Sequence, residues 1–558
     1  MLKKFVLLSV LLTLLVGQTG GVGGPHSIVH AANLFVHPGL LHTQVDFTRM
    51  TQMVNAGTQP YLDGWHQLVN SPLSSSGWTP RATSIIVRGG EGANNGLLHT
   101  DAARAYQTAL RWKISGSTAH GDTARDILNA WSSTLTAING NADRYLAAGL
   151  QGYQLANAAE IMRGYPGFHV TQMQDMLLDV FYKQRNELFL LGNEYGVDHN
   201  GAYIQNYWAN WDLSNMAATV AIGIFCDRRD IYDIGLEYFK HGLGNGSIYN
   251  AIPYLHPNGL AQWQESGRDQ PHTLMGVGLM AAIAEMAWNQ GDDLYGWANN
   301  RLMRAAEYVA RYNIGSNTVP FSTYEWGSGV NGSVQTQTVI SDSGRYAMRP
   351  IWEMLYNHYA NRKGLSVPNI AAAAGMTRPE GGPVSSSPSS FDELGFGTLL
   401  YTRPPGGGGS AVLPQGNIPD GTYRFVLRLD GKVMEAAGTS DGAVVRKSTY
   451  TGSANQHWNV THLGGGQYSV RNAQSGRALD VASASHLHSA SFIIWNYSGA
   501  DNQRFAFLPT GGGYYRITPA HSNKPVDVPG SSTAEGVALK QWRYILGSNQ
   551  QWQLVPVP

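Results

Sequence analysis

Apolar residues recur at three- and four-residue spacing along most of the first 400 residues. The longest such runs are separated by Gly- or Asn-rich breaks and cover residues 99–114, 121–138, 145–164, 170–192, 213–227 and 272–290. This spacing puts apolar side chains on one face of a helix, so each run predicts an amphipathic α-helix. A long series of helices with short connections forms hairpins, and we therefore expect an (α/α) toroid over residues 33–402.

The helical pattern ends near residues 379–390, a stretch rich in Pro, Gly and Ser. The run "FGTLLYT" (396–402) predicts a strand that closes the helical domain, and residues 403–416 predict a flexible linker. Short β-type runs follow at residues 423–429, 467–472 and 514–520, with turn residues between them. The chain is thus expected to be multidomain, with a mainly α domain followed by an all-β domain over residues 417–558.

The C-terminal domain repeats itself every 47 residues. Asn-Gln-His-Trp ends at Trp458, Asn-Gln-Arg-Phe at Phe505 and Asn-Gln-Gln-Trp at Trp552. A fixed period is the signature of a repeat architecture. Residues from about 416 to 558 resemble the ricin-type β-trefoil lectin domains, the family-thirteen carbohydrate-binding modules, which carry a threefold Gln-x-Trp. The resemblance implies a β-trefoil that binds a sugar.

The same resemblance implies which residues face the sugar. The Gln and Trp of the motif belong to the core, whereas an earlier Asp, an aromatic residue and the Asn of the motif contact sugar. In the second and third repeats these are Asp480, Trp495, Tyr497, Asn502, Asp527, Trp542, Tyr544 and Asn549. A carboxylate accepts from hydroxyls, an amide donates and accepts, and a flat ring covers an apolar sugar face. The first repeat has Glu435 and Ser448 at the acid and Trp positions, so it is the weaker candidate.

The N-terminus has the pattern of a secretory signal peptide over residues 1–31. Lys3 and Lys4 precede a mainly apolar region of twelve residues, and the small residues Ala31 and Ala32 offer the cleavage site. An uncleaved anchor is the alternative, but twelve residues are short for a membrane span. We therefore expect a secreted, extracellular protein. The single cysteine, Cys226, lies in an apolar run and predicts a buried free thiol.

Charge excludes two classes of partner. Only 14% of the residues are charged and the formal net charge is zero. The chain therefore has no basic field for nucleic acid or for a membrane surface. An anionic substrate would have to be recognised by a few local Arg, Lys and His residues.

Two polar segments each lead into an apolar helix. They are "QNYWANWDLSN" (205–215) and "GLAQWQESGRDQPHTLMGVG" (259–278). Helix N-termini favour anions, so both segments suit a carboxylated sugar. At "NWDLSN", "QESGRDQ" and "EMAWNQGDDLYG" the chain resembles the alginate-lyase-type polysaccharide lyases, family thirty-eight-like, over about residues 35–365. This resemblance implies a toroid that cleaves uronic-acid polysaccharides such as alginate or glucuronan by β-elimination, without metal or cofactor.

β-Elimination needs a group that neutralises the uronate carboxylate, a base for the carbon-5 proton and an acid for the leaving oxygen. The resemblance implies Asn210, His272 and Arg268 around the carboxylate and Tyr324 for proton transfer. Cations near Tyr324 would have to stabilise its phenolate. No Arg lies between Tyr312 and Tyr324, where the family pattern has one. Arg345 or Arg349 could serve from another loop, with Tyr346 and Tyr207 as rival tyrosines.

Further substrate contacts are expected from Trp211, Trp263, Gln264, Glu265, Arg345 and Arg349. Each catalytic candidate also has a structural interpretation. His272 and Asn210 could cap helices, and Arg268 could be an ion pair of Glu265 or Asp269.

Two other functions stay open at this point. An inverting glycoside hydrolase on the same toroid would need two separated carboxylates, drawn from Glu265, Asp269 and Asp212. A non-catalytic glycan-binding protein would need none. For the leading interpretation, the expected partners are an acidic polysaccharide and a glycan of the lectin domain, with the chain acting as a monomer.

Overall fold

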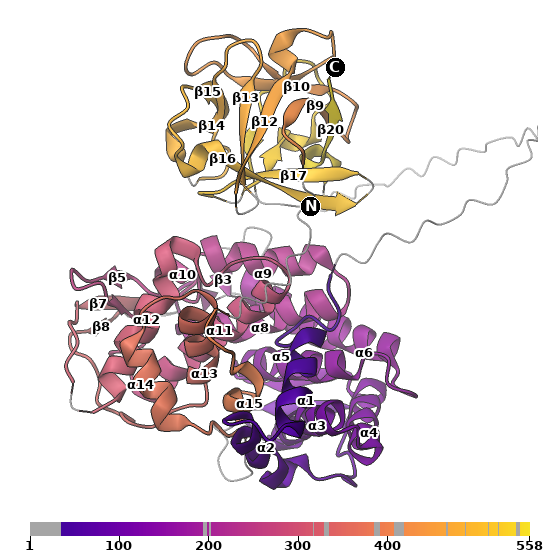
Figure 1. The fold of residues 1–558 in the computed structure, drawn as a ribbon, viewed down its shortest axis with the longest axis vertical. Helices are drawn as coiled ribbons and strands as arrows, with labels where there is room; N and C mark the ends of the chain where they lie inside the picture. Colours follow the sequence, from indigo (N-terminus) through magenta and orange to yellow (C-terminus); the bar gives the residue numbers. More distant parts are fainter. Residues whose placement is uncertain are drawn as a thin grey trace, which may run out of the picture. The chain divides into compact units, whose positions relative to one another are not determined.

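The computed structural model describes residues 35–192, 198–199, 202–315, 317–328, 334–383, 391–406, 418–464, 467–485, 487–511, 513–522, 524–542 and 547–557. Helices predominate in the described chain up to residue 401, with short strand pairs between them, and strands predominate from residue 421 onward (Figure 1). An α domain followed by an all-β domain is thereby confirmed. The predicted signal peptide and most of the predicted linker lie outside the described residues.

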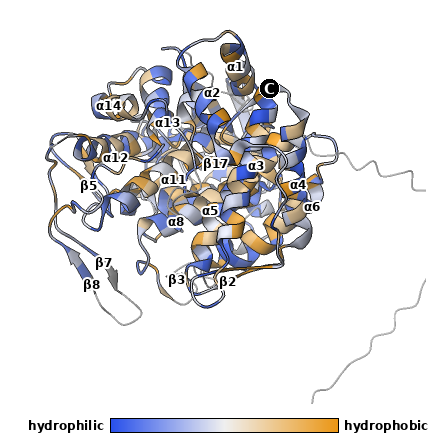
Figure 2. Cartoon of the chain, turned by 90° about the horizontal axis from the view of Figure 1, so that it is seen from below, coloured by the Kyte–Doolittle hydropathy of each residue, from blue (hydrophilic) through white to orange (hydrophobic). Residues whose placement is uncertain are grey.

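The long helices alternate between an inner and an outer position. The inner helices are α3 (Gly96–Ser115), α5 (Arg144–Met162), α8 (Ala209–Phe225) and α11 (Gln270–Asn289). Helix α5 packs against α3 and α8, and α8 packs against α11 (Figure 2). Each inner helix is followed by an outer segment. Helix α4 (Thr118–Thr134) follows α3, α9 (Arg229–His241) follows α8, and α12 (Trp297–Asn313) follows α11. The outer segment after α5 is a continuous run of α6 (Val170–Met176), the π-helical η2 (Leu177–Asn186) and α7 (Glu187–Leu191). All six predicted runs form helices, but the run predicted over 121–138 leaves the helix after Thr134, and its last two residues begin strand β2 (Ala137–Gly140).

The inner helices are parallel, so their N-terminal ends lie at the same side of the domain. Gly149 of α5 faces Ser214 of α8, and Gly152 faces Ala218, so residue numbers rise together along the two helices. The glycines permit this packing, because a Cβ at Gly149 would lie 2.5 Å from the Ser214 Oγ. Strands β1 (Ile85–Arg88) and β2 (Ala137–Gly140) pair in parallel and lead into α3 and α5. Four helix N-termini therefore share one rim.

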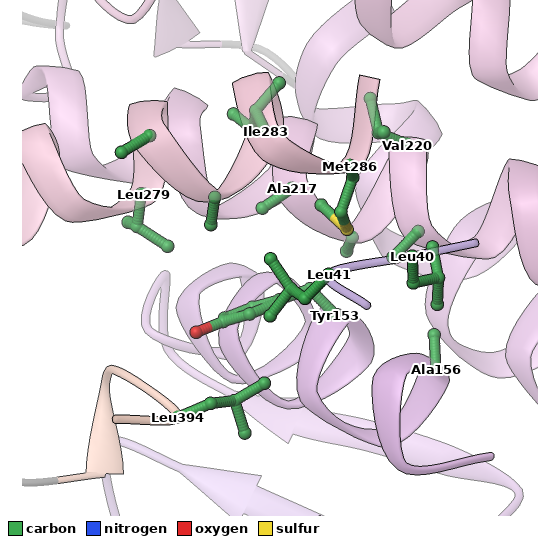
Figure 3. Packing of buried hydrophobic residues seen from close by; sticks show 14 of the residues in the cluster. Leu40, Leu41, Tyr153, Ala156, Ala217, Val220, Leu279, Ile283, Met286 and Leu394 are labelled. Carbon is green, nitrogen blue, oxygen red and sulfur yellow. The ribbon is translucent and has the colours of Figure 1, made fainter. Parts of the chain in front are cut away.

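Apolar side chains fill the space between α5, α8 and α11. Figure 3 shows Leu40 and Leu41 from the N-terminal segment against Tyr153 and Ala156 of α5, with Met286 of α11 beside them. Apolar burial of this extent stabilises the domain by roughly 25 cal/mol per Å² of surface removed from water. The core thus fixes the inner helices, and with them the polar residues at their N-terminal ends.

The remaining helices are shorter. They are α1 (Gln44–Asn55), α2 (Tyr61–Asn70), α10 (Ile248–Ala251), α13 (Trp352–Tyr356) with the π-helical η3 (Asn357–Arg362), α14 (Pro368–Thr377) and α15 (Gly397–Tyr401). The strand predicted at 396–402 is wrong, because this segment is helix α15. Gly64 allows α2 to lie close to α15, since a Cβ at Gly64 would lie 2.6 Å from the Leu399 nitrogen. The apolar run is thus buried by packing on a helix rather than in a sheet.

Asp46 connects the beginning of the helical domain with its end. Its buried carboxylate pairs with Arg49 and with Arg403, both at 2.6 Å, and accepts from the Thr43 nitrogen at 2.8 Å. Burial alone would raise the pKa of Asp46, but the charges of Arg403 and Arg49 outweigh it and hold the pKa far below its usual value.

We expect Asp46→Asn to destabilise the helical domain by about 3–5 kcal/mol at neutral pH, because two buried guanidinium groups lose their counter-charge. The depressed pKa means that this stability is present above the unfolded-state pKa of about 4 and is lost as the pH falls below it. Denaturant unfolding of both proteins across this pH range measures the difference, with the exposed Asp63→Asn as control. A difference that does not change with pH would contradict this account.

The C-terminal domain contains twelve described strands, four for each repeat. They are β9 (Gly421–Leu427), β10 (Val433–Ala436), β11 (Val445–Ser448), β12 (Trp458–Gly464), β13 (Gln467–Asn472), β14 (Ala478–Val481), β15 (Phe492–Trp495), β16 (Arg504–Gly511), β17 (Tyr514–Pro519), β18 (Val526–Asp527), β19 (Lys540–Gln541) and β20 (Trp552–Pro556). Strands β9, β12, β13, β16, β17 and β20 pair in a closed ring, and three hairpins cover it. This is the predicted β-trefoil.

The repeated motif residues form its core, as predicted. Trp458, Phe505 and Trp552 are completely buried. The indole nitrogens of Trp458 and Trp552 donate to the carbonyls of Met434 and Val526.

No helix in the described part of the chain is long and apolar enough to cross a membrane.

Candidate active site

The two polar segments predicted from the sequence meet at the N-terminal ends of α8 and α11. The first backbone N–H groups of α8 donate to side chains of the other segment, Ala209 to Gln264 at 3.3 Å and Asn210 to Glu265 at 3.1 Å. Asp269 caps α11, since its carboxylate accepts from the His272 nitrogen at 2.8 Å. The caps therefore fix the two helix ends against each other.

Glu265 is the centre of this junction. Its carboxylate is fully buried and accepts from the Asn210 Nδ2 at 2.5 Å and from Arg268 at 2.9 Å. Burial raises the pKa of Glu265, although Arg268, His272 and Asn210 act in the opposite direction. Glu265 thus positions Asn210 and Arg268, and its buried carboxylate does not reach a substrate. Asn210 is only 1% exposed, so it too acts inside this junction.

His272 stands at the accessible side of the junction. Its Nδ1 lies 2.8 Å from the Asp269 carboxylate, and its Nε2 lies 3.2 Å from a nitrogen of Arg268. A carboxylate only accepts and a guanidinium only donates, so Nδ1 carries the proton and Nε2 holds a lone pair. The side chains of His272 and Arg268 are 40% and 25% exposed. The arrangement is an oriented neutral imidazole beside a fixed cation.

The other two carboxylates of this region, those of Asp212 and Asp269, also have partners. Asp212 is fully buried, lies 2.8 Å from the His199 Nε2 and accepts from the Gly246 nitrogen at 2.6 Å. Asp269 is bound to His272, and burial, which would raise its pKa, is outweighed by this bond, so its pKa is lowered. None of the three candidates for the two carboxylates of a glycoside hydrolase is therefore free to act as an acid facing the substrate.

Tyr324 begins β7 (Tyr324–Ser328), which pairs with β8 (Val334–Gln337). Its hydroxyl is buried without a well-formed hydrogen bond in the described part of the chain. Burial is the main cause that raises its pKa far above the usual value, and the Glu265 charge raises it further. The expectation that cations stabilise a Tyr324 phenolate is therefore not met in this conformation.

The rival tyrosine Tyr346 is 53% exposed and its backbone is left-handed, with φ of 73°. Such a conformation is strained for a bulky residue and persists only where contacts impose it. The loop is held to the start of α11, because the Gln270 nitrogen donates to the Ser343 carbonyl at 2.9 Å and Gly344 packs on Pro271. The Arg345 guanidinium lies 5.2 Å from the Tyr346 ring.

The second rival, Tyr207, is half-buried at the start of α8. Its ring lies 4.7 Å from that of Trp211 and 5.2 Å from that of Phe189. Burial raises the pKa of Tyr207, and Tyr145, Arg144 and Asp143 are close enough to influence it. Tyr207 therefore connects the α8 end with the start of α5.

Glu265 is one of the six predicted substrate contacts, and four of the others also have structural roles. Trp263 is fully buried under Gly276, so it belongs to the core and cannot be a sugar platform. Gln264 is buried as a helix cap. Arg345 donates to the carbonyls of Tyr312 and Asn317. Arg349 is buried against Asp392 and Glu393, and burial raises the pKa of Glu393 to about 7. Only Trp211 remains partly exposed beside the junction.

The structure adds basic residues that sequence reasoning missed. Arg88 and His99 lie around the start of α3, and Arg144 begins α5. The only sequence signal for this group of basic residues is an Arg at the end of a short apolar run, followed by the Gly-rich "GGEGANNG". In the described residues, no group of three His, Cys, Asp or Glu side chains could hold a metal ion.

The second lectin repeat forms a pocket of about 490 Å³. Asp480, Trp495 and Asn502 line it, and Trp495 is 46% exposed. The Asp480 carboxylate accepts from Asn502 at 3.0 Å and from Gln503 at 2.8 Å, so one side of the acid is fixed. Tyr497 is not among the pocket-lining residues and instead packs under Arg471 at 4.1 Å.

The third repeat keeps the bond from the motif Asn to the acid, whereas in the first repeat Asn455 donates to the Ala436 carbonyl instead. In the third, Asp527 accepts from Asn549 at 2.8 Å, burial raises the Asp527 pKa to about 6, and Trp542 is 38% exposed. The predicted contact Tyr544 lies outside the described residues. In the first, Glu435 pairs with Arg446 at 2.6 Å and Ser448 donates to Glu535 at 2.8 Å. An ion pair thus occupies the acid of the first repeat.

We expect Trp495→Ala to weaken binding of a polymeric glycan about tenfold, and the double variant with Trp542→Ala to abolish retention by the lectin module, because each ring covers one sugar and two weak sites act together. Affinity electrophoresis on a panel of polysaccharides measures the retention. Arg446→Ala serves as control, since it alters only the first repeat. Undiminished retention by the double variant would show that sugar binds elsewhere.

Comparisons with known proteins agree with both halves. Residues 88–320 match the family model described as alginate lyase, and residues 412–558 match the model of ricin-type β-trefoil lectin-like domains in three overlapping segments. Solved structures similar to a quarter of this chain include a designed threefold symmetric protein (42% identity, 100% of that chain, TM-score 0.24). An exo-β-1,3-galactanase from Clostridium thermocellum is 36% identical, with 31% of that chain covered and a TM-score of 0.24. The Rhizoctonia solani agglutinin is 21% identical, with 98% of that chain covered and a TM-score of 0.23. Each match covers 25% of this chain. No curated protein matches this chain.

Proposed function

We propose that this chain, which combines an alginate lyase domain with a ricin-type β-trefoil lectin module, cleaves a uronic-acid-containing polysaccharide by β-elimination outside the cell. The observation that carries the proposal is the Asp269–His272–Arg268 arrangement at the start of α11. It supplies a base and a carboxylate-binding cation side by side. The net charge of zero makes such a local cation necessary for an anionic substrate.

The arrangement links substrate binding to activation of the base. Without substrate, the His272 Nε2 accepts a hydrogen bond from Arg268. A uronate carboxylate is a stronger acceptor for a guanidinium than a neutral imidazole is. Binding of the substrate carboxylate by Arg268 therefore frees the Nε2 lone pair. The neutralised carboxylate at the same time makes the carbon-5 proton more acidic.

The bond changes then follow in order. The His272 Nε2 takes the carbon-5 proton, the electron pair forms the carbon-4–carbon-5 double bond, and the carbon-4–oxygen bond breaks. The leaving oxygen needs a proton, and Tyr346 is the best-placed tyrosine because its loop is attached to the start of α11 and its ring is exposed. Asp269 holds the imidazole in the required tautomer.

Ultraviolet absorbance on alginate, polymannuronate, polyguluronate, glucuronan and a neutral xylan tests this function. We expect absorbance to rise on at least one uronan and not on xylan, because only elimination creates a double bond conjugated to the carboxylate. Tyr346→Phe should lower kcat about 10²-fold or more, and Tyr324→Phe should not. Release of reducing ends without absorbance would instead establish hydrolysis.

A further inference from the structure

Arg88 is a cation whose side chain has no paired carboxylate among the described residues of the toroid. It ends β1, just before α3, and its guanidinium forms no hydrogen bond or ion pair with any residue in the described ranges. Asp143 and Asp392 influence it only at longer range, and Asp392 is already paired with Arg349. Burial lowers the pKa of Arg88, yet a guanidinium remains protonated in proteins. A partly buried, unpaired cation is a favourable place for an anionic ligand.

His99 supplies neutral polar groups next to this cation. Its ring stacks on Phe391 at 4.2 Å with an interplanar angle of 5°. Burial, followed by the charges of Arg88 and Arg81, lowers the pKa of His99 to about 4, so the ring is neutral at neutral pH. A neutral imidazole offers one donor and one acceptor, which suits a sugar hydroxyl.

Polar and aromatic residues lie on the rim between Arg88 and Arg268. Asp143, at the start of α5, is near both Arg88 and Tyr207. Tyr207 packs on Trp211 at the start of α8, and Arg268 lies 5.1 Å from the ring of the neighbouring Trp208. The order along the rim is thus α3, α5, α8 and α11. Three spacings between adjacent helices amount to roughly 25–30 Å, which is the length of several sugar residues.

We propose that Arg88 is a distal subsite that binds the carboxylate of a uronate several residues away from the cleaved bond. The inference rests on the proposed function and deepens it, because it makes a polyuronate chain, rather than a single uronate beside the bond, the recognised substrate. Arg268 binds the carboxylate at the reacting sugar and Arg88 binds one farther along the same chain.

Saturated oligouronates of increasing length test the subsite without the need for turnover. Their binding is measured by isothermal titration to the full chain carrying His272→Ala together with Trp495→Ala and Trp542→Ala, which keeps the lectin pockets from contributing. In this background, Arg88→Gln should weaken binding of long oligomers about tenfold and leave disaccharide binding unchanged, because one charge-assisted hydrogen bond is lost. Arg88→Lys should restore part of the affinity.

Arg125→Gln is the matched control. It removes the same charge from outer helix α4, where Arg125 pairs with Asp122 and Asp126, and it should not change binding at any length. Loss at every length in Arg88→Gln, or no loss at all, would overturn the subsite. Arg88-dependent binding without any elimination by the parent enzyme would refute the proposed reaction and keep the subsite. Normal elimination with Arg88-independent KM at all lengths would refute the subsite alone.

Discussion

The His272→Ala variant is expected to lose about 10²–10⁴-fold in kcat on a uronan while its fold is unchanged. The loss follows from removal of the base that takes the carbon-5 proton. The fold should survive because the imidazole is 40% exposed, and because the cap at the start of α11 uses the His272 backbone nitrogen, which the variant retains. Initial rates of absorbance change, together with the melting temperature, measure both parts of the prediction.

Two further variants separate a base from a structural histidine. Asp269→Asn should lower kcat tenfold or more, since an amide can also stabilise the wrong tautomer of His272. His169→Ala, an exposed histidine at the start of α6, should retain full activity. If His272→Ala kept more than a tenth of the activity at an unchanged melting temperature, His272 would not be the base.

Glu265→Ala is expected to destabilise the helical domain by about 3–5 kcal/mol and to remove activity as well. The substitution leaves the buried Asn210 amide and the Arg268 guanidinium without their shared acceptor. Glu265→Gln retains the shape and one acceptor oxygen, so it should cost less, about 1–3 kcal/mol. Denaturant unfolding followed by far-ultraviolet circular dichroism measures the helical transition.

The exposed Glu91→Ala provides the comparison for Glu265, because it removes a carboxylate that lies at the surface of a loop. It should leave both stability and activity unchanged. A Glu265→Ala protein as stable as the parent would mean that Asn210 and Arg268 find other partners, and the described junction would then not position them.

Helix positions could be predicted from the sequence because the core imposes a period on it. Helices α8 and α11 are buried nearly all round, yet each begins at a polar segment that marks its N-terminal end. The closing segment 396–402 was misassigned because a short apolar run has no period of its own. Only its packing on α2 determines that it is helical.

The candidate site could be predicted in part. His272, Arg268 and Asp269 are near one another in the sequence, so the motif kept them together. Trp263 was misassigned because no local pattern says that it faces Gly276 in the interior. Arg88 was missed because 180 residues separate it from Arg268, and only the parallel inner helices place them on the same rim.

In the trefoil, too, the architecture could be predicted from the sequence, but one side-chain pairing could not. The period of 47 residues fixed the architecture, since three equal repeats must close on one another. The pairing of Glu435 with Arg446 could not be deduced from either residue alone, because it depends on the register between β10 and β11. That register turns the acid of the first repeat into half of an ion pair.

Mass spectrometry of the products from the best uronan tests the central claim most directly. The account predicts unsaturated oligouronates, each lighter by one water molecule than the corresponding hydrolysis product, which His272→Ala does not form. Products that are all saturated, with no species lighter by one water molecule, would contradict it, because they would show that water is added across the bond and that the reaction is hydrolysis.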